Sequence, residues 1–333
     1  MTEMIFDTKP GPTPVRDAAH QRVDAQELYG LLVDTDVAFS NHKGIYKPGF
    51  ERRQRSLLKK LSFLAPFLEP REKILQVTTG CSPLSFLEQL LTGAILYSLK
   101  RALFVFTDRR ILHIPCSPGL NYRNSIAQIL YADCRNVRIR FSTLIASYKS
   151  GLMEKFPCIS RKNRKKLKAI LKNASRDGQT SPELGRAHLC PQCSRPLIKN
   201  YYACPHCSLK FKKKSWAAAF SIIFPGGGYF YTRHPWVGLL EAMMELAFTF
   251  TLALFVTAFS MRLPFNPQEL NQAIVICATV IVFEKLVTIF YAEKAVEEFI
   301  PSKRRIQLKI EEVEQYHVSS KVQHVDTIGW RSR

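Results

Sequence analysis

The sequence contains few cysteines, and no basic-then-apolar segment stands near its first residue. Nine cysteines in 333 residues are too few for a disulfide-stapled secreted scaffold. The opening residues, MTEMIFDTKPGPTPVRD, lack the pattern of a cleavable signal peptide, so we expect none. Apolar residues make up 46% of the chain and the mean hydropathy is −0.08. These values exclude a mainly disordered chain and one embedded in lipid throughout, and the length allows two or three domains.

The recognisable motifs of an enzyme are also missing. We find no nucleophile–base constellation and no open metal site in the sequence. The glycines at 226–228 do not form a nucleotide loop, because no Lys-Ser/Thr follows them and no soluble strand precedes them. We therefore expect a protein that is not an enzyme.

Positive charge is concentrated in one block of the chain. The whole sequence has 48 Lys and Arg against 27 Asp and Glu, and residues 155–214 alone have 16 against 2. This block precedes an apolar region, which favours a membrane surface over nucleic acid as its partner. The basic residues expected at that surface are Lys210, Lys212, Lys213 and Lys214.

Two long apolar runs predict a transmembrane hairpin. Residues 236–259 and 274–292 are each long enough, or nearly so, to cross a hydrocarbon core of about 30 Å as a helix. Pro264 and Pro267 in the intervening turn prevent helix continuation. The alternative is a pair of buried helices in a large soluble domain.

A shorter apolar segment, 216–231, is broken by Pro225 and three glycines. If it turns back instead of crossing, the lysines before it and the basic cluster 303–305 lie on the same side, as the positive-inside rule requires. We therefore expect a re-entrant or interfacial segment, two crossings and both termini in the cytoplasm.

The motif FPGGGYFYTRHPWVGLLEAM resembles the glycine-rich hairpin of the TM-two domain and its bacterial relatives. The matching residues are Pro225, Gly226, Gly228, Phe230 and Tyr231. Arg233 stands near where that family usually has glycine. The resemblance covers about 45 residues, and it implies a chain reversal at the membrane interface, where glycine allows close backbone approach. It also implies the bacterial cytoplasmic membrane as the location.

Charged residues within the expected spans require partners. Counted inward from the cytoplasmic ends, Glu245 and Lys285 lie at similar depths and are expected to pair, with Glu241 nearer the surface. Glu284 points to a different side of its helix. We favour a structural ion pair plus an oligomer contact over a proton or substrate relay.

Four cysteines have the spacing of a metal site. Cys190 and Cys193 form one CxxC knuckle, and Cys204 and Cys207 form another after ten intervening residues. Two such knuckles bring four thiolates to one tetrahedral Zn²⁺ at about 2.3 Å, with iron as the minor alternative. The site is closed to substrate and is therefore structural.

The pattern resembles the short zinc ribbon found beside membrane segments in many bacterial proteins. That family usually has glycine after each knuckle, where Ser194 and Ser208 stand here. The other thiols, which we expect to be buried in a reducing compartment, are Cys81, Cys116, Cys134, Cys158 and Cys277.

Short strands with turns are expected over 74–158, followed by a basic amphipathic helix, RKNRKKLKAILKN. This order suggests a small β-barrel with a C-terminal capping helix. The run Thr107–Leu112 and the later SGLMEKFPCI resemble bacterial pleckstrin-homology (PH) and GRAM-like domains over residues 70–175. Residues 82–98 depart from a minimal barrel and suggest an extra helix.

Helices are also expected at 25–38 and 50–68, before this barrel. The second has an apolar face and a basic face, so it either lies on anionic lipid or packs on the barrel.

Relatives of such barrels bind lipid headgroups or protein segments. The residues placed to contact phosphate are Lys100, Arg101, Arg109, Arg110 and Lys149. The alternative is that they are solvated charges of turns and edges.

The sequence therefore predicts an α+β multidomain membrane protein. Its parts are an N-terminal helical segment (1–69), a PH/GRAM-like barrel (70–175), a linker (176–187), a zinc ribbon (188–211), a membrane region (212–292) and a cytoplasmic tail (293–333).

We expect a membrane-anchored binding or scaffold protein that recognises anionic phospholipid or a protein partner, or that forms a homo-oligomer. The first alternative is a transporter or enzyme that uses Glu241, Glu245 and Glu284. The second is a membrane-tethered nucleic-acid binder, which we consider the weaker partner class.

Overall fold

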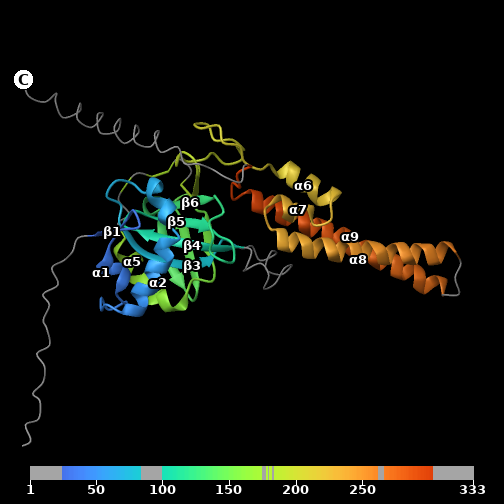
Figure 1. Cartoon of the computed structure of the whole chain (residues 1–333), viewed down its shortest axis with the longest axis horizontal. Coiled ribbons are helices and arrows are strands. Elements are labelled where there is room, and N and C mark those ends of the chain that lie inside the picture. Colours follow the sequence, from blue (N-terminus) through green and yellow to red (C-terminus); the bar gives the residue numbers. More distant parts are fainter. Residues whose placement is uncertain are drawn as a thin grey trace, which may run out of the picture.

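The computed structural model describes residues 25–83, 100–174, 178, 180–181, 184–261 and 266–302. The expected extra helix at 82–98 falls almost entirely outside these residues, as do the start of the N-terminal segment and most of the tail. Figure 1 shows a sheet-rich part from which a helical hairpin extends. The chain thus combines strands and helices, as expected from its sequence.

The sheet-rich part contains two separate sheets. The first has seven strands in the order β1-β2-β3-β4-β5-β6-β10, and all neighbours are antiparallel except β2 and β3. Its strands are β1 (Gln26–Leu28), β2 (Leu31–Val33), β3 (Ile74–Cys81), β4 (Arg101–Thr107), β5 (Arg110–Pro115), β6 (Ile126–Leu130) and β10 (Ala187–Leu189). The second is an antiparallel sheet of β7 (Cys134–Arg140), β8 (Thr143–Tyr148) and β9 (Met153–Phe156).

The expected barrel is therefore not closed. A short 3-10 helix, η2 (Tyr131–Asp133), interrupts the chain between β6 and β7. The free edge of β6 pairs instead with β10, a strand that is distant from β6 in the sequence. Because β10 occupies that edge, β7 cannot continue the first sheet and begins the second.

The central strands β4 and β5 are buried on both faces, which explains their nearly continuous apolar sequences. One core lies between the first sheet and a layer of α1 (Thr35–Phe39), α2 (Pro48–Lys59) and the 3-10 helix η1 (Ser62–Phe67). The other core lies between that sheet, the second sheet and α5 (Arg164–Asn173). The basic helix expected after the strands thus covers the second core with Leu167, Ile170 and Leu171.

The N-terminal segment differs from expectation at 25–38. Residues 26–33 form the hairpin of β1 and β2, and only α1 is helical. Tyr29 and Gly30 both have positive φ, which permits the tight reversal. In the following segment Leu58, Leu61 and Leu64 are fully buried, so its apolar face packs on the sheet instead of lying on lipid.

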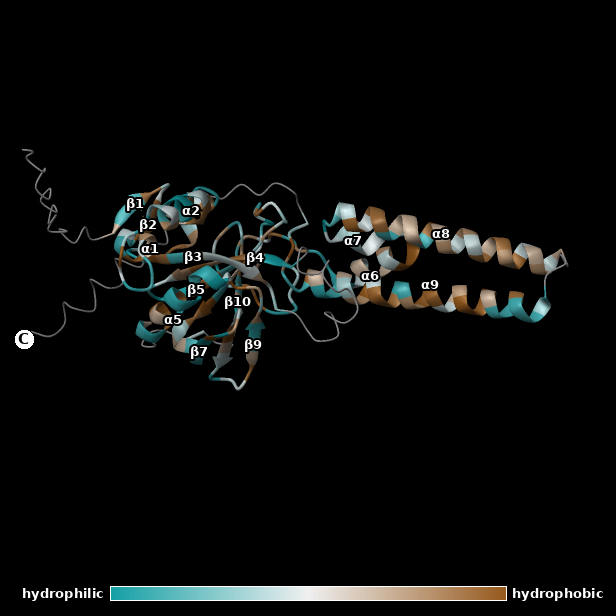
Figure 2. Ribbon diagram, turned by 90° about the horizontal axis from the view of Figure 1, so that it is seen from below, coloured by the Kyte–Doolittle hydropathy of each residue, from teal (hydrophilic) through white to brown (hydrophobic). Residues whose placement is uncertain are grey.

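The hairpin consists of α8 (Pro235–Ser260) and α9 (Pro267–Val296). They are long and apolar enough to cross a membrane, with mean hydropathies of 1.8 and 2.3, and only 6% of each apolar window is buried. Figure 2 shows hydrophobic residues over most of both helices. Helix α9 begins seven residues earlier than expected, because Pro267 is tolerated in the first turn and the Asn266 side chain accepts a hydrogen bond from the Gln268 backbone.

The glycine-rich segment forms two short helices, α6 (Lys214–Ile223) and α7 (Gly227–Tyr231), at the base of this hairpin. The chain turns at Gly226, where φ is +63°. A Cβ atom there would lie 2.1 Å from the Gly238 carbonyl oxygen, so α7 and α8 approach closely only because glycine occupies this position.

Candidate functional site: the four-cysteine centre and the base of the hairpin

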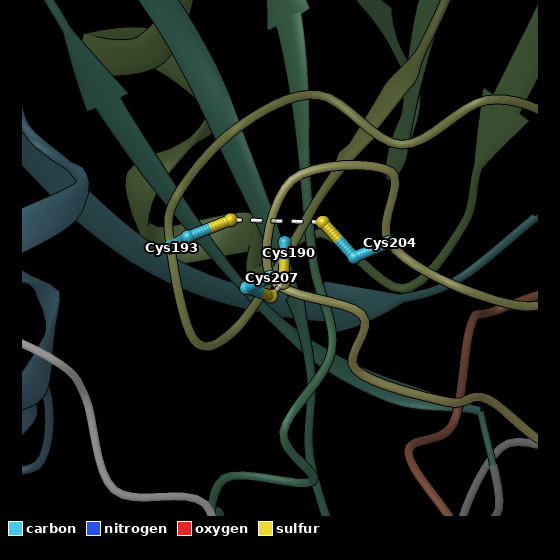
Figure 3. Close-up of side chains that lie close together, drawn as sticks. All are labelled: Cys190, Cys193, Cys204 and Cys207. Carbon is cyan, nitrogen blue, oxygen red and sulfur yellow. Dashed lines mark hydrogen bonds between the residues drawn. The ribbon is translucent and has the colours of Figure 1, made fainter. Parts of the chain in front are cut away.

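The four predicted metal ligands converge, although they come from two loops (Figure 3). All four sulfur atoms lie within 4.8 Å of one another. Cys190 Sγ is 3.5 Å from Cys207 Sγ, and Cys193 Sγ is 3.6 Å from Cys204 Sγ. Tetrahedral Zn²⁺ with bonds of about 2.3 Å requires sulfurs about 3.8 Å apart. The donor set and its spacing therefore fit a structural metal ion.

The electrostatics of the cluster also suit a metal ion. Hydrogen bonds from neighbouring thiols, chiefly Cys190, lower the pKa of Cys193 to about 5. Metals bind the thiolate form of cysteine. Hydrogen bonding to Cys193 raises the pKa of Cys190, and burial raises that of Cys207, so a bound cation would be needed to hold these thiols as thiolates.

Each knuckle ends on a residue in left-handed conformation, with φ of 59° at Ser194 and 56° at Ser208. This backbone explains why glycine is usual there in the zinc ribbons that the sequence resembles. Ser194 carries a second penalty, because its Oγ is buried with no hydrogen-bond partner among the described residues. The serines are accommodated at some cost to the fold.

Of the cysteines outside the cluster, Cys81, Cys116 and Cys134 are buried as expected. Cys277 is half-buried. Cys158 is exposed, contrary to expectation.

The ribbon connects the first sheet to the hairpin. It follows β10 directly, and its last residues pair with the chain beyond α9: Lys212 N donates to Ile300 O at 2.9 Å, and Ser302 N donates to Lys210 O at 2.9 Å. Phe211 and Phe299 pack edge to face with ring centroids 5.5 Å apart. The four-cysteine cluster thus lies at the point where both parts meet.

The four lysines expected at a membrane surface lie at this base. The Lys212 ammonium sits 4.4 Å from the centroid of the Tyr231 ring, and Lys214 Nζ is 2.7 Å from a Glu297 carboxylate oxygen. Lys210 and Lys213 are exposed. Two of the four therefore contact the helices, and two project into solvent.

The expected ion pair between Glu245 and Lys285 is present within the hairpin. Glu245 is only 4% exposed and also accepts a hydrogen bond from Gly226 N at 3.0 Å. Lys285 Nζ additionally donates to Ser221 O at 2.8 Å. The pair thereby ties α8 and α9 to the reversal between α6 and α7.

The other two carboxylates have different surroundings. Glu241 Oε1 accepts a hydrogen bond from Thr288 Oγ1 at 2.6 Å. Both carboxylate oxygens of Glu284 are buried, and no group in the described part of the chain hydrogen-bonds to them. Glu284 thus does not take part in the Glu245–Lys285 ion pair.

The five basic residues proposed to contact phosphate do not form one surface. Lys100 and Arg101 stand at the start of β4, whereas Arg109 and Arg110 follow its end. Lys149 is exposed after β8.

Two of these residues have acidic partners within the chain. Arg109 Nη1 lies 2.6 Å from Glu69. Arg110 is 5% exposed, and its Nη2 lies 2.7 Å from Glu72. Arg110 therefore stabilises the fold.

Sequence reasoning missed a buried ionic network between the sheets and the hairpin. Arg186 lies 3.1 Å from Glu154 of β9 and 3.3 Å from Glu298, just after α9. Although burial opposes it, the Arg186 guanidinium lowers the pKa of Glu298 to about 2. Arg186 was assigned to a linker and Glu298 to a tail, and no local pattern marks either one.

No protein-family model matches the chain, and the searches of curated proteins and of solved structures likewise found no match. The resemblances to PH-like, zinc-ribbon and TM-two domains consequently rest on the motifs quoted above.

Proposed function

We propose that this chain is a membrane-anchored binding protein. Helices α8 and α9 anchor it in the bacterial cytoplasmic membrane, both termini face the cytoplasm, and the sheets with the zinc ribbon recognise an anionic phospholipid or a protein partner. The observation that carries the proposal is the exposure of two long apolar helices next to a polar, folded part of the same chain. Such surfaces are stable only when lipid or protein covers them.

Three features support a rigid presentation of the sheets at the membrane. The ribbon joins the end of α9 to β10. The Arg186–Glu298 ion pair spans the same junction. Lys210 and Lys213 project from the base of the hairpin, and each such cation contributes about 1 kcal/mol near anionic lipid.

Alkaline carbonate extraction of membranes that contain the full chain tests the anchor. We expect the protein to remain in the pellet. Replacing Leu254 and Val282, which are 53% and 59% exposed, by arginine should lower that retention, because arginine is unfavourable by about 3 kcal/mol at the centre of a span.

The matched control replaces Leu152 and Met153 by arginine. These residues are also exposed, at 62% and 56%, but they lie in the sheet-rich part, where Met153 begins β9 and Leu152 precedes it. Release of the wild-type protein, or equal loss in both double variants, would contradict the anchor.

Hydrogen exchange of the full chain in nanodiscs tests the binding role. If anionic lipid is the ligand, loops of the sheet-rich part should exchange more slowly in phosphatidylglycerol than in phosphatidylcholine. Equal exchange in both would favour a protein partner.

A second candidate function is proton or cation passage along the hairpin, favoured by the buried Glu284 carboxylate, which has no hydrogen-bond partner among the described residues. Removing its charge with Glu284→Gln should then abolish ion flux into proteoliposomes, whereas Glu269→Gln at the exposed start of α9 should not. Absence of flux through the wild-type protein would eliminate this candidate.

A further inference from the structure

A cavity of about 50 Å³ lies between the first sheet and the base of the hairpin. Its walls come from the first sheet with its loops, from the segment between α7 and α8, and from the end of α9. Lys100 lies just before β4, Arg123 precedes β6, and His234 immediately precedes α8. Tyr229 and Tyr291, from α7 and α9, add aromatic surface.

The cavity lies at the level of the hairpin's ends. His234 borders the first residue of α8, and Ala295 belongs to the last turn of α9. Helices of 26 and 30 residues are about 39 and 45 Å long, which exceeds a hydrocarbon core of about 30 Å. If α8 and α9 span the membrane, as the proposed function requires, the cavity is at the level of the lipid headgroups.

Arg123 is partly buried in this cavity wall, where its described neighbours offer no acidic partner. Its guanidinium contacts the ring of His234, and no carboxylate of the described residues forms an ion pair with it. Burial lowers the pKa of Arg123, which reflects the cost of holding an uncompensated cation away from water.

The acidic residue in the cavity wall does not neutralise this charge. Glu298 is already paired with Arg186 at 3.3 Å. Lys100 adds a further positive charge to the wall. Among the described residues of the wall, the charge of Arg123 therefore stays without a counter-charge next to aromatic surface.

We propose that this cavity binds the phosphate group of an anionic phospholipid, with Arg123 as its principal ligand. A guanidinium donates two parallel hydrogen bonds to a phosphate and is less strongly hydrated than an ammonium, so it suits a half-buried site. Lys100 and His234 flank Arg123, and the two tyrosines contact the apolar part of the lipid. The lipid thereby joins the sheets to the hairpin.

Thermal unfolding of the full chain in nonionic detergent tests this proposal. The probes are dispersed phosphatidylglycerol, phosphatidylcholine and inorganic phosphate. We expect phosphatidylglycerol alone to raise the Tm saturably, as a ligand of the native state must. Arg123→Gln should weaken its apparent affinity about tenfold or more, the usual effect of losing a charge-assisted hydrogen-bonding group.

The matched control is Arg138→Gln, which removes the same charge from an exposed position of β7 and should leave the affinity unchanged. Lys100→Gln should weaken binding less than Arg123→Gln. Because no acidic residue in the described part of the chain pairs with Arg123, Arg123→Gln should not lower the Tm of the lipid-free protein. A structural role for Arg123 predicts the opposite result.

Equal responses to both phospholipids, or equal losses in the Arg123 and Arg138 variants, would overturn the proposal. Arg123-dependent stabilisation by inorganic phosphate but not by lipid would show a soluble anion as the ligand and would also overturn it. These measurements need no membrane insertion, so failure of the anchor in carbonate extraction is distinguishable from failure of this site.

Discussion

Ser194 shows how a single residue can oppose the local fold around it. Its backbone has φ of +59°, and its buried hydroxyl has no partner in the described part of the structure. We expect Ser194→Gly to increase the stability of the metal-loaded protein by about 1 kcal/mol, because it removes both penalties.

The rate of zinc release to a chelator measures this effect. Ser208→Gly is the control, since Ser208 shares the left-handed backbone without the orphaned hydroxyl. Its release should slow less. Faster release from the Ser194 variant would contradict the interpretation.

The Glu245–Lys285 ion pair, in contrast to Ser194, stabilises the fold around it. Replacing Lys285 by Met leaves Glu245, which is 4% exposed, without its counter-charge. We expect a marked fall in the Tm of the detergent-solubilised protein, since breaking a buried pair costs about 3–5 kcal/mol.

Two variants distinguish the effect of losing the ion pair from the effect of losing a positive charge. Lys213→Met removes an exposed lysine and should leave the Tm nearly unchanged. The double variant Glu245→Gln/Lys285→Met should recover part of the loss. An unchanged Tm in the single Lys285 variant would contradict the pairing.

At the scale of elements, the reversal between α6 and α8 depends on close contact at glycine. A methyl group on Gly226 would lie 2.1 Å from the Gly238 carbonyl oxygen, and its φ of +63° disfavours alanine as well. We expect Gly226→Ala to destabilise the hairpin base by at least about 2 kcal/mol. Gly49→Ala in α2, where nothing lies within 4 Å, should be neutral or stabilising. Similar Tm values for the two variants would refute this role.

Metal binding by the ribbon should require all four of its cysteines. Cys190→Ser is expected to lower the zinc content of the full chain from one atom towards none, because three remaining thiolates bind less tightly. The exposed Cys158 provides the control, and Cys158→Ser should retain the metal. Elemental analysis of the purified proteins measures both. Stoichiometric iron in the wild type would correct the identity of the metal.

Elements with a strong local signal could be predicted from the sequence, and those built by distant pairing could not. The paired CxxC knuckles and the two apolar runs carry their information within short segments. Strands β1, β2 and β10 have only three residues each, too few for a periodic pattern. The pairing of β10 with β6, which keeps the barrel open, depends on a contact between distant residues. Arg123 was missed for the same reason, because only folding brings it beside His234.

At the scale of the whole molecule, three parts of the chain meet at one buried network. Arg186 lies just before β10, His113 belongs to β5, and Glu298 follows α9. Arg186 Nη1 lies 3.3 Å from both His113 Nδ1 and the Glu298 carboxylate. This network fixes the hairpin relative to the sheets, so its protonation should affect the stability of the entire chain.

Acidification should weaken this junction. Burial lowers the pKa of His113 to about 3, with Arg186, His188 and Lys100 also opposing its protonation and Glu298 favouring it. Since the unfolded imidazole titrates near 6.5, the unfolded state binds more protons below that pH. The stability due to neutral His113 is thus complete above pH 6.5 and falls as the pH decreases towards 3.

Glu298 also stabilises the folded chain less as the pH falls, but its effect appears in a lower pH range. Its pKa of about 2, against an ordinary value of 4.5, makes its stabilisation complete above pH 4.5 and progressively lost below it. Between pH 6.5 and 4.5 the loss of stability at this junction therefore comes from His113 and not from Glu298. The contribution of His113 changes by up to about 1.4 kcal/mol per pH unit.

Urea unfolding of the full chain at pH 7, 6 and 5 measures this dependence, and His113→Gln isolates one histidine. Metal loss at low pH affects both proteins equally because they share the same cysteines, so the informative quantity is the difference between their pH slopes. Glutamine retains a polar partner for Ser82 and Arg186 but cannot bind the proton. We expect the variant to be less stable at pH 7 and to lose less stability on acidification. Parallel slopes would mean that His113 is protonated as easily in the folded chain as in the unfolded one, and that water reaches the junction.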